Sequence, residues 1–237
     1  RDHAERALER DAWSDAAELL DAVLKDSPDD DEAFALRDLA LGAMEPSEAG
    51  ARLTTHLTAA IARTKDEPER RMLRLRLADH EANHGGGASS ALAVLRAALA
   101  EAPADERPDL LALAIAAGDD TSAGDADADG VEALLTTASK DKDAVYASAA
   151  LRALAARAAD PETGATLALK AQKNSPSDED LGLLESMWRA GARGAPLVDA
   201  LWPRVDAPAA RAELLEQAVE HHGKEASNAW LDAWATA

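Results

Sequence analysis

The stretch AAELLDAVLKDSP at residues 16–28 decides the fold, because its spacing occurs twice more, as ALAVLRAALAEAP at 91–103 and GATLALKAQKNSP at 164–176. In each copy, small or apolar residues stand at the first, fifth and eighth positions, and Pro stands at the thirteenth. Offsets of four and seven lie on one face of a helix, and the Pro ends that helix. The spacing therefore predicts three helices that bury the faces Ala16–Leu20–Val23, Ala91–Leu95–Ala98 and Gly164–Ala168–Ala171.

The distance between the copies predicts a helical repeat array. The closing prolines are 75 and 73 residues apart, which is about two units of 36–37 residues each and within the range of such arrays. About a quarter of the chain is Ala, the best helix former, whereas Tyr and Phe occur once each. We therefore expect an all-α protein.

Pro, Gly and capping residues divide the chain into about fourteen helices, or seven antiparallel pairs. We expect repeats over 1–117, an acidic loop over 118–130, further repeats over 131–191 and an irregular helical cap over 192–237. The expected helices are 2–11, 14–26 (capped by Ser14), 31–44, 46–64, 67–84, 88–101, 108–117, 130–140, 142–159, 161–174, 177–191, 196–202, 207–222 and 224–236.

Residues 4–34 resemble a tetratricopeptide repeat, and 70–103 and 146–176 resemble mainly its second helix. The residues that carry the resemblance are Ala4, Ala7, Trp13, Ala16, Leu20, Val23, Pro28 and Phe34. The resemblance implies a right-handed α-solenoid of about six or seven antiparallel hairpins. It also implies a groove lined by the first helix of each pair, which binds a partner protein or peptide without chemistry.

Charge and composition exclude several classes of function. The net charge of −20 argues against nucleic acid and anionic membrane surfaces as partners, and it favours basic partners. The absence of Cys excludes disulfides and thiol catalysis. No run of apolar residues is long enough to insert into a membrane. An Ala- and Arg-rich, Lys-poor composition suggests a bacterial protein. The sequence leaves the compartment open between the cytoplasm, which we slightly favour, and the periplasm.

The sequence HEANH at 80–84 is a literal H-E-x-x-H motif. On a helix it places His80 and His84 one turn apart, with Glu81 as a potential general base for zinc-bound water, as in zinc metallopeptidases. A third His is missing, because Ser90 stands where the extended motif requires it. The alternative is a helix end before Gly85, with His84 near the negative end of the helix dipole.

The sequence DADADG at 125–130 resembles the first half of an EF-hand calcium loop. Asp125, Asp127 and Asp129 alternate and Gly130 follows, but Thr136 stands where a bidentate Glu is required. A calcium-modulated binding module is therefore a second alternative. The other interpretation is an acidic loop in which Asp129 caps the next helix. We expect no bound cofactor.

Two groups of residues are candidates for partner binding. Arg70, Arg71, Arg74 and Arg76 form a basic cluster in an acidic chain, and Arg70 and Arg74 share a helix face. They would hold an acidic peptide or form salt bridges with Asp66, Glu67 and Glu69. The candidate groove comprises Arg70, Arg74, Glu32 and Asp38. Trp230 and Trp234 share a face of the last helix and form either a docking surface or a terminal core.

Overall fold

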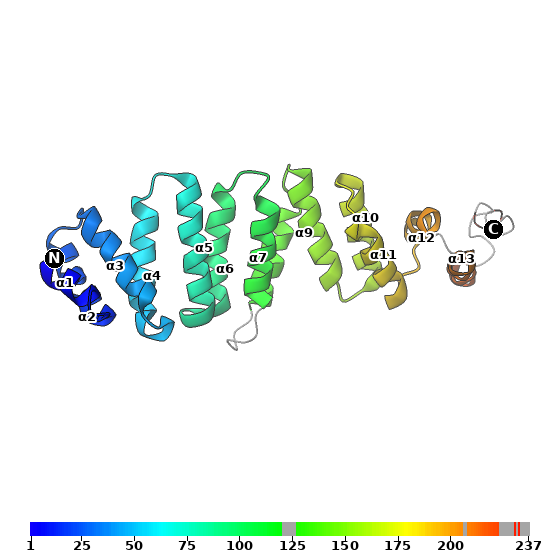
Figure 1. Cartoon of the computed structure of the whole chain (residues 1–237). Coiled ribbons are helices and arrows are strands. Elements are labelled where there is room, and N and C mark those ends of the chain that lie inside the picture. Colours follow the sequence, from blue (N-terminus) through cyan, green and yellow to red (C-terminus); the bar gives the residue numbers. More distant parts are fainter. Residues whose placement is uncertain (120–126, 206–207, 223–229, 231, 233–237) are drawn as a thin grey trace. The chain divides into compact units, whose positions relative to one another are not determined.

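The protein is all-helical, and its helices pack mostly in chain order (Figure 1). The computed structural model describes residues 1–119, 127–205, 208–222, 230 and 232. These residues form thirteen α-helices and one short 3-10 helix. None of the described helices is both long and apolar enough to cross a membrane. The chain divides into two compact units, Arg1–Val131 (unit 1) and Glu132–Ala237 (unit 2).

Within unit 1, each helix packs against the next one along the chain. Its helices are α1 (Asp2–Leu8), α2 (Trp13–Asp26), α3 (Asp31–Ala43), α4 (Pro46–Arg63), α5 (Glu67–His84), α6 (Gly87–Glu101) and α7 (Arg107–Asp119), and the first residues of α8 (Ala128–Ala138) follow.

Unit 2 begins within α8, at Glu132. Its helices pack around an apolar core that includes Leu184, Leu201 and Trp230. Its further helices are α9 (Ala144–Arg157), α10 (Pro161–Asn174), α11 (Glu179–Ala190), α12 (Ala195–Leu201), the 3-10 helix η1 (Trp202–Arg204) and α13 (Pro208–His222).

The repeated spacing lies on the buried faces that it predicts. Every residue of the three predicted faces is buried except Val23, which is partly buried against the core. The helices that carry the spacing end at Asp26, Glu101 and Asn174, each two residues before its Pro. Small residues on these faces let neighbouring helices approach closely. At Gly164, an added Cβ would meet Met187 Sδ of α11 and the Ala155 carbonyl of α9.

Predicted helix ends differ from the observed ones by up to three residues, as at 142–159 against Ala144–Arg157, and three of the differences have a local cause. The first helix stops at Leu8 rather than at residue 11, because the chain turns there and Asp11 adopts a left-handed φ of 57°. Ser14 does not cap the second helix, which already begins at Trp13 with Ala12 before it. Asp129 lies inside α8, whereas Asp127 accepts the Gly130 N–H at 2.8 Å and caps that helix.

Helical residues also occupy both ends of the segment 118–130, since α7 continues to Asp119 and α8 begins at Ala128. Residues 120–126, including Asp125, lie outside the described residues, as does most of the expected helix 224–236.

Ion pairs join both neighbouring and alternate helices of unit 1. Six arginine–carboxylate links connect residues separated by 31 to 38 positions. Arg52–Glu18 and Arg76–Asp38 join alternate helices, whereas Arg63–Asp31 and Arg70–Glu101 join neighbouring ones. The links are Arg1–Glu32, Arg52–Glu18, Arg63–Asp31, Arg70–Glu101, Arg71–Glu106 and Arg76–Asp38.

Candidate binding grooves

A first groove, of about 710 Å³, lies between α3 and α5 with residues of α4 between them. Aromatic and charged side chains build its wall. Phe34 stacks on His56 with ring centroids 4.3 Å apart, and the Arg63 guanidinium lies 4.5 Å from the Phe34 centroid. The lining residues are Asp31, Phe34, Ala35, Asp38, His56, Ala60, Arg63, Thr64, Lys65, Glu69 and Leu73.

His56 fixes the charge of Asp38 in this groove. The His56 ring is buried between two charged side chains. Its Nδ1 lies 3.2 Å from Arg37 Nη1, and its Nε2 lies 3.2 Å from Asp38 Oδ1. A guanidinium can only donate, so these partners assign Nδ1 as an acceptor and place the ring proton on Nε2. The hydrogen bond from His56, supported by Arg76, lowers the pKa of Asp38 from 3.8 to about 2. Asp38 is therefore ionised at neutral pH.

A second groove, of about 360 Å³, lies between α5 and α7 and is mostly apolar. The α5 side chains that line it recur at offsets of three, four, seven and eight, so they form a stripe along one side of that helix. Leu113 of α7 is 49% exposed there. The lining residues are Leu75, Ala78, Asp79, Ala82, Asn83, Leu95, Leu113, Ala116 and Ala117.

Residues of α5 line both grooves. Glu69 and Leu73 of α5 line the first groove, and Leu75 and Ala82 line the second. A ridge of Met72, Arg76, Asp79 and Asn83 lies between these two sets at helical spacing, and its last two residues also line the second groove. Met72 at its start is 66% exposed. A partner lying on this ridge would reach both grooves.

The basic cluster forms ion pairs with neighbouring helices rather than with the expected acids of its own helix. Arg70 Nε lies 2.8 Å and Arg74 Nη1 lies 2.5 Å from Glu101 Oε2 of α6. These hydrogen bonds lower the pKa of Glu101. The remaining pairs bring other predicted site residues together: Arg71 with Glu106, Arg76 with Asp38, and Glu32 with Arg1.

His80 and Glu81 of the HEANH motif are buried and bonded within unit 1. His80 Nε2 donates to the Gly50 carbonyl at 3.0 Å, where α4 kinks because Gly50 adopts a φ of 34°. Glu81 accepts the Thr54 hydroxyl at 2.6 Å and the Gly86 N–H at 2.7 Å. Burial raises the pKa of Glu81, but these hydrogen bonds outweigh it and the net shift is downward.

The candidate metal ligands do not converge on one position in the part of the chain that the structure describes. His84 ends α5, as expected, with its ring centroid 5.9 Å from that of His80. The described residues contain no group of three or more His, Asp or Glu side chains that could hold a metal ion.

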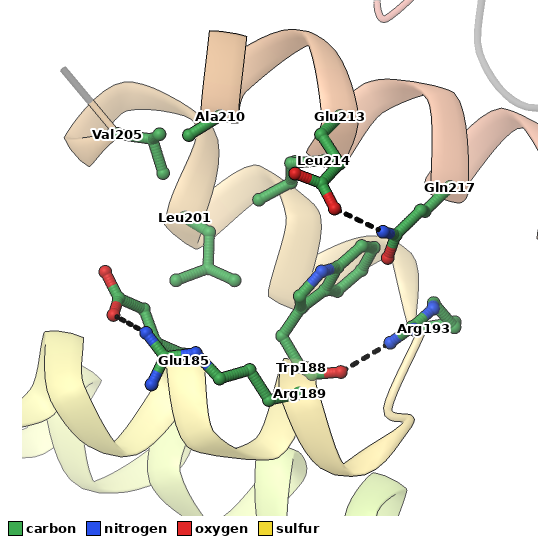
Figure 2. Close-up of a pocket in the computed structure, with 10 residues that line it drawn as sticks. All are labelled: Glu185, Trp188, Arg189, Arg193, Leu201, Val205, Ala210, Glu213, Leu214 and Gln217. Atoms are coloured by element: carbon green, nitrogen blue, oxygen red, sulfur yellow. Dashed lines mark hydrogen bonds and ion pairs between the residues drawn. The ribbon is translucent and has the colours of Figure 1, made fainter. Parts of the chain in front are cut away.

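A pocket of about 480 Å³ in unit 2 lies between α11 and α13. Figure 2 shows the Trp188 ring rising from α11 toward Gln217. The Arg193 guanidinium lies 4.2 Å from the centroid of the Trp188 ring. Two side-chain pairs flank the pocket, Glu185 with Arg189 at 2.9 Å and Glu213 with Gln217 at 3.1 Å.

Trp230 lies in the core of unit 2. Its side chain is buried, and Nε1 donates to Asp199 Oδ1 at 2.9 Å. The edge of its ring faces His222, with centroids 5.5 Å apart. Trp234 lies outside the described residues.

Sequence reasoning missed the apolar groove between α5 and α7. The spacing Leu75–Ala78–Ala82 on α5 and Leu113–Ala116–Ala117 on α7 contains the signal, but these residues read equally well as core positions. Comparison with protein-family models, with curated proteins and with solved structures found no match for the chain. The class that the findings define is therefore an all-helical protein with sequentially packed helices.

Proposed function

We propose that this chain is a non-catalytic interaction scaffold, a tetratricopeptide-like right-handed solenoid of six or seven hairpins that binds a partner protein. The observation that carries the proposal is the pair of grooves in unit 1 whose walls share helix α5. Exposed large apolar side chains occur on helices that line these grooves: Leu39 on α3, Met72 on α5 and Leu113 on α7. Leu113 itself lines the second groove, and an apolar side chain exposed in a groove is typical of protein–protein interfaces.

The contacts of the polar residues also support a scaffold. The HEANH residues His80 and Glu81 hold α4, α5 and α6 together through Gly50, Thr54 and Gly86. Arg70 and Arg74 fasten α5 to Glu101 of α6. These side chains therefore rigidify the helices that present the grooves.

The test is a groove-dependent capture of a partner. The full chain would be used as bait in cells of its source organism, together with the groove variant Ala35→Gln/Leu113→Ser. The control is Leu19→Ser, which alters an apolar side chain that is 40% exposed on α2 and lines neither groove. Quantitative mass spectrometry should identify a protein that wild type and control enrich at least about tenfold over the groove variant. If the groove variant captures every co-purifying protein as well as wild type does, the proposal fails.

A further inference from the structure

The α5–α7 groove runs along two helices and is lined mostly by small and apolar side chains. Its α5 side runs from Leu75 to Asn83, about 12 Å along the helix axis. Small side chains dominate the stripe, with Ala78 and Ala82 on one side and Ala116 on the other. Such positions let a second backbone approach closely, while Leu113 offers exposed apolar surface in the groove. An amphipathic helix would place its apolar side chains in this groove.

The edges of the groove are acidic. Asp79 lines it from α5, and the exposed Asp109 lies one helical turn before the lining residue Leu113 on α7. Neither carboxylate forms an ion pair with another described residue. A partner with cationic groups beside its apolar face would complement both.

Unit 1 as a whole carries the same sign of charge. Residues 1–131 hold 15 of the 20 net negative charges of the chain. A further hollow in unit 1, of about 420 Å³, is lined by the Trp13 side chain and four carboxylates, and no basic residue lines it. Long-range attraction would thus favour a basic partner before contact is made. The four carboxylates are Asp11, Asp15, Glu45 and Glu48.

We infer that the α5–α7 groove binds an amphipathic helix of a partner protein whose polar edges carry Lys or Arg. This inference rests on the proposed function and adds the chemistry of the partner. The apolar face of the bound helix lies along Leu75, Ala82 and Leu113. Its cationic side chains lie beside Asp79 and Asp109.

The test uses fluorescently labelled synthetic peptides and the full chain. The probe is a helix of about 18 residues with Leu on one face and Lys on the other positions. A second peptide replaces every Lys by Glu, and a third scrambles the Leu and Lys positions. Fluorescence anisotropy should show that the Leu/Lys helix binds at least about tenfold more tightly than either comparison peptide.

Variants then locate the peptide on the protein. Leu113→Ser should weaken the Leu/Lys helix about tenfold, whereas Leu19→Ser should leave its Kd unchanged. Asp79→Asn and Asp109→Asn should each weaken it about two- to fivefold and reduce its salt dependence. The matched control is Asp26→Asn, because Asp26 is exposed at the end of α2 and lines neither the grooves nor the acidic hollow. Circular dichroism would verify that each variant remains helical.

The outcomes separate this inference from the proposed function. The inference is overturned if the scrambled peptide binds as tightly as the Leu/Lys helix, or if Leu113→Ser does not change the Kd of that helix. Either result would reveal only general attraction of a basic peptide to an acidic protein. Groove-dependent binding of the Glu peptide would overturn the basic partner but leave the groove as a binding site. If no peptide binds while cells yield a groove-dependent partner, the inference fails and the scaffold function stands.

Discussion

Alternate helices are linked by an ion pair in both units, but the two links differ in burial. In unit 1, Arg76 of α5 pairs with Asp38 of α3, and both side chains are 40% exposed beside an open groove. In unit 2, Arg152 of α9 pairs with Asp180 of α11, and the exposed fractions are 15% and 1%. There α9 and α11 also pack directly against each other. The comparison suggests that an exposed ion pair between alternate helices leaves a groove between them open. A buried ion pair accompanies direct helix packing, which stabilises the fold instead.

Breaking the buried link should have the largest effect. Asp180→Ala removes the buried partner of Arg152 and leaves a mostly covered guanidinium without its carboxylate, so we expect a loss of about 3 kcal/mol in the free energy of unfolding. Urea unfolding followed by Trp fluorescence would measure it, since four of the five Trp lie in residues 132–237. The exposed neighbour Asp178 supplies the control Asp178→Ala, which should stay within about 0.5 kcal/mol of wild type. A loss below about 1 kcal/mol would contradict the difference between the two links.

Breaking the exposed link should cost less. Asp38→Ala removes an ion pair that water already screens, but it also leaves Nε2 of the buried His56 without an acceptor. We expect a loss of about 1–2 kcal/mol in urea unfolding, followed by far-UV circular dichroism. Asp38→Asn should lose less, because the Asn carbonyl can accept the His56 proton. If Asp38→Ala and Asp180→Ala lower the free energy of unfolding equally, the exposed and the buried ion pair do not differ in the way proposed.

Two glycines test how closely the helices approach in each unit. Gly164→Ala in unit 2 presses a methyl group against Met187, Ala155 and Ala158, and should lower the free energy of unfolding by about 1 kcal/mol despite its better helix propensity. Gly42→Ala in unit 1 meets only the end of the Arg76 side chain, at 3.2 Å. Because that guanidinium can shift, this variant should be about 0.5 kcal/mol more stable than wild type. Urea unfolding of both variants under the same conditions would show whether their signs differ.

The pH dependence of the exposed link should be small but measurable. The pKa of Asp38 falls from 3.8 to about 2 on folding. Its ionised form therefore stabilises the fold above about pH 4, and this contribution disappears as the pH falls through about 2. After discounting for the 40% exposure of Asp38, we expect the stability difference between wild type and Asp38→Asn to shrink by about 1 kcal/mol across that range. Unfolding curves at several pH values would contradict this if the difference stays constant.

The sequence predicts the helices and their buried faces well for a physical reason. Ala16, Leu20 and Val23 stand at helical spacing, as do their counterparts at 91–98 and 164–171, and Pro28, Pro103 and Pro176 follow the helices that carry them. Both signals are local, because spacing and Pro act within one helix. The two wrong caps, Ser14 and Asp129, arise because several neighbouring residues can cap a helix and local sequence does not choose among them.

The candidate site was harder to predict, because its contacts join distant residues. Arg70 and Arg74 have Asp66, Glu67 and Glu69 nearby in sequence, yet both pair with Glu101. The groove between α5 and α7 depends on which side of Leu75 and Leu113 remains uncovered after packing. A single sequence shows the spacing of such residues along a helix, but it does not show which other helix packs over them.

The spacing of the ion pairs has a consequence for synthesis of the chain on the ribosome. Asp38 is made 38 residues before Arg76, and Arg70 is made 31 residues before Glu101. At the usual rate of translation, each of these side chains waits about 2 to 8 seconds for its partner. During that time the newest helix carries unpaired charges, which favour its hydration until the partner helix emerges. The contacts that join α3 to α5 and α5 to α6 can thus form only in the order in which these helices are translated.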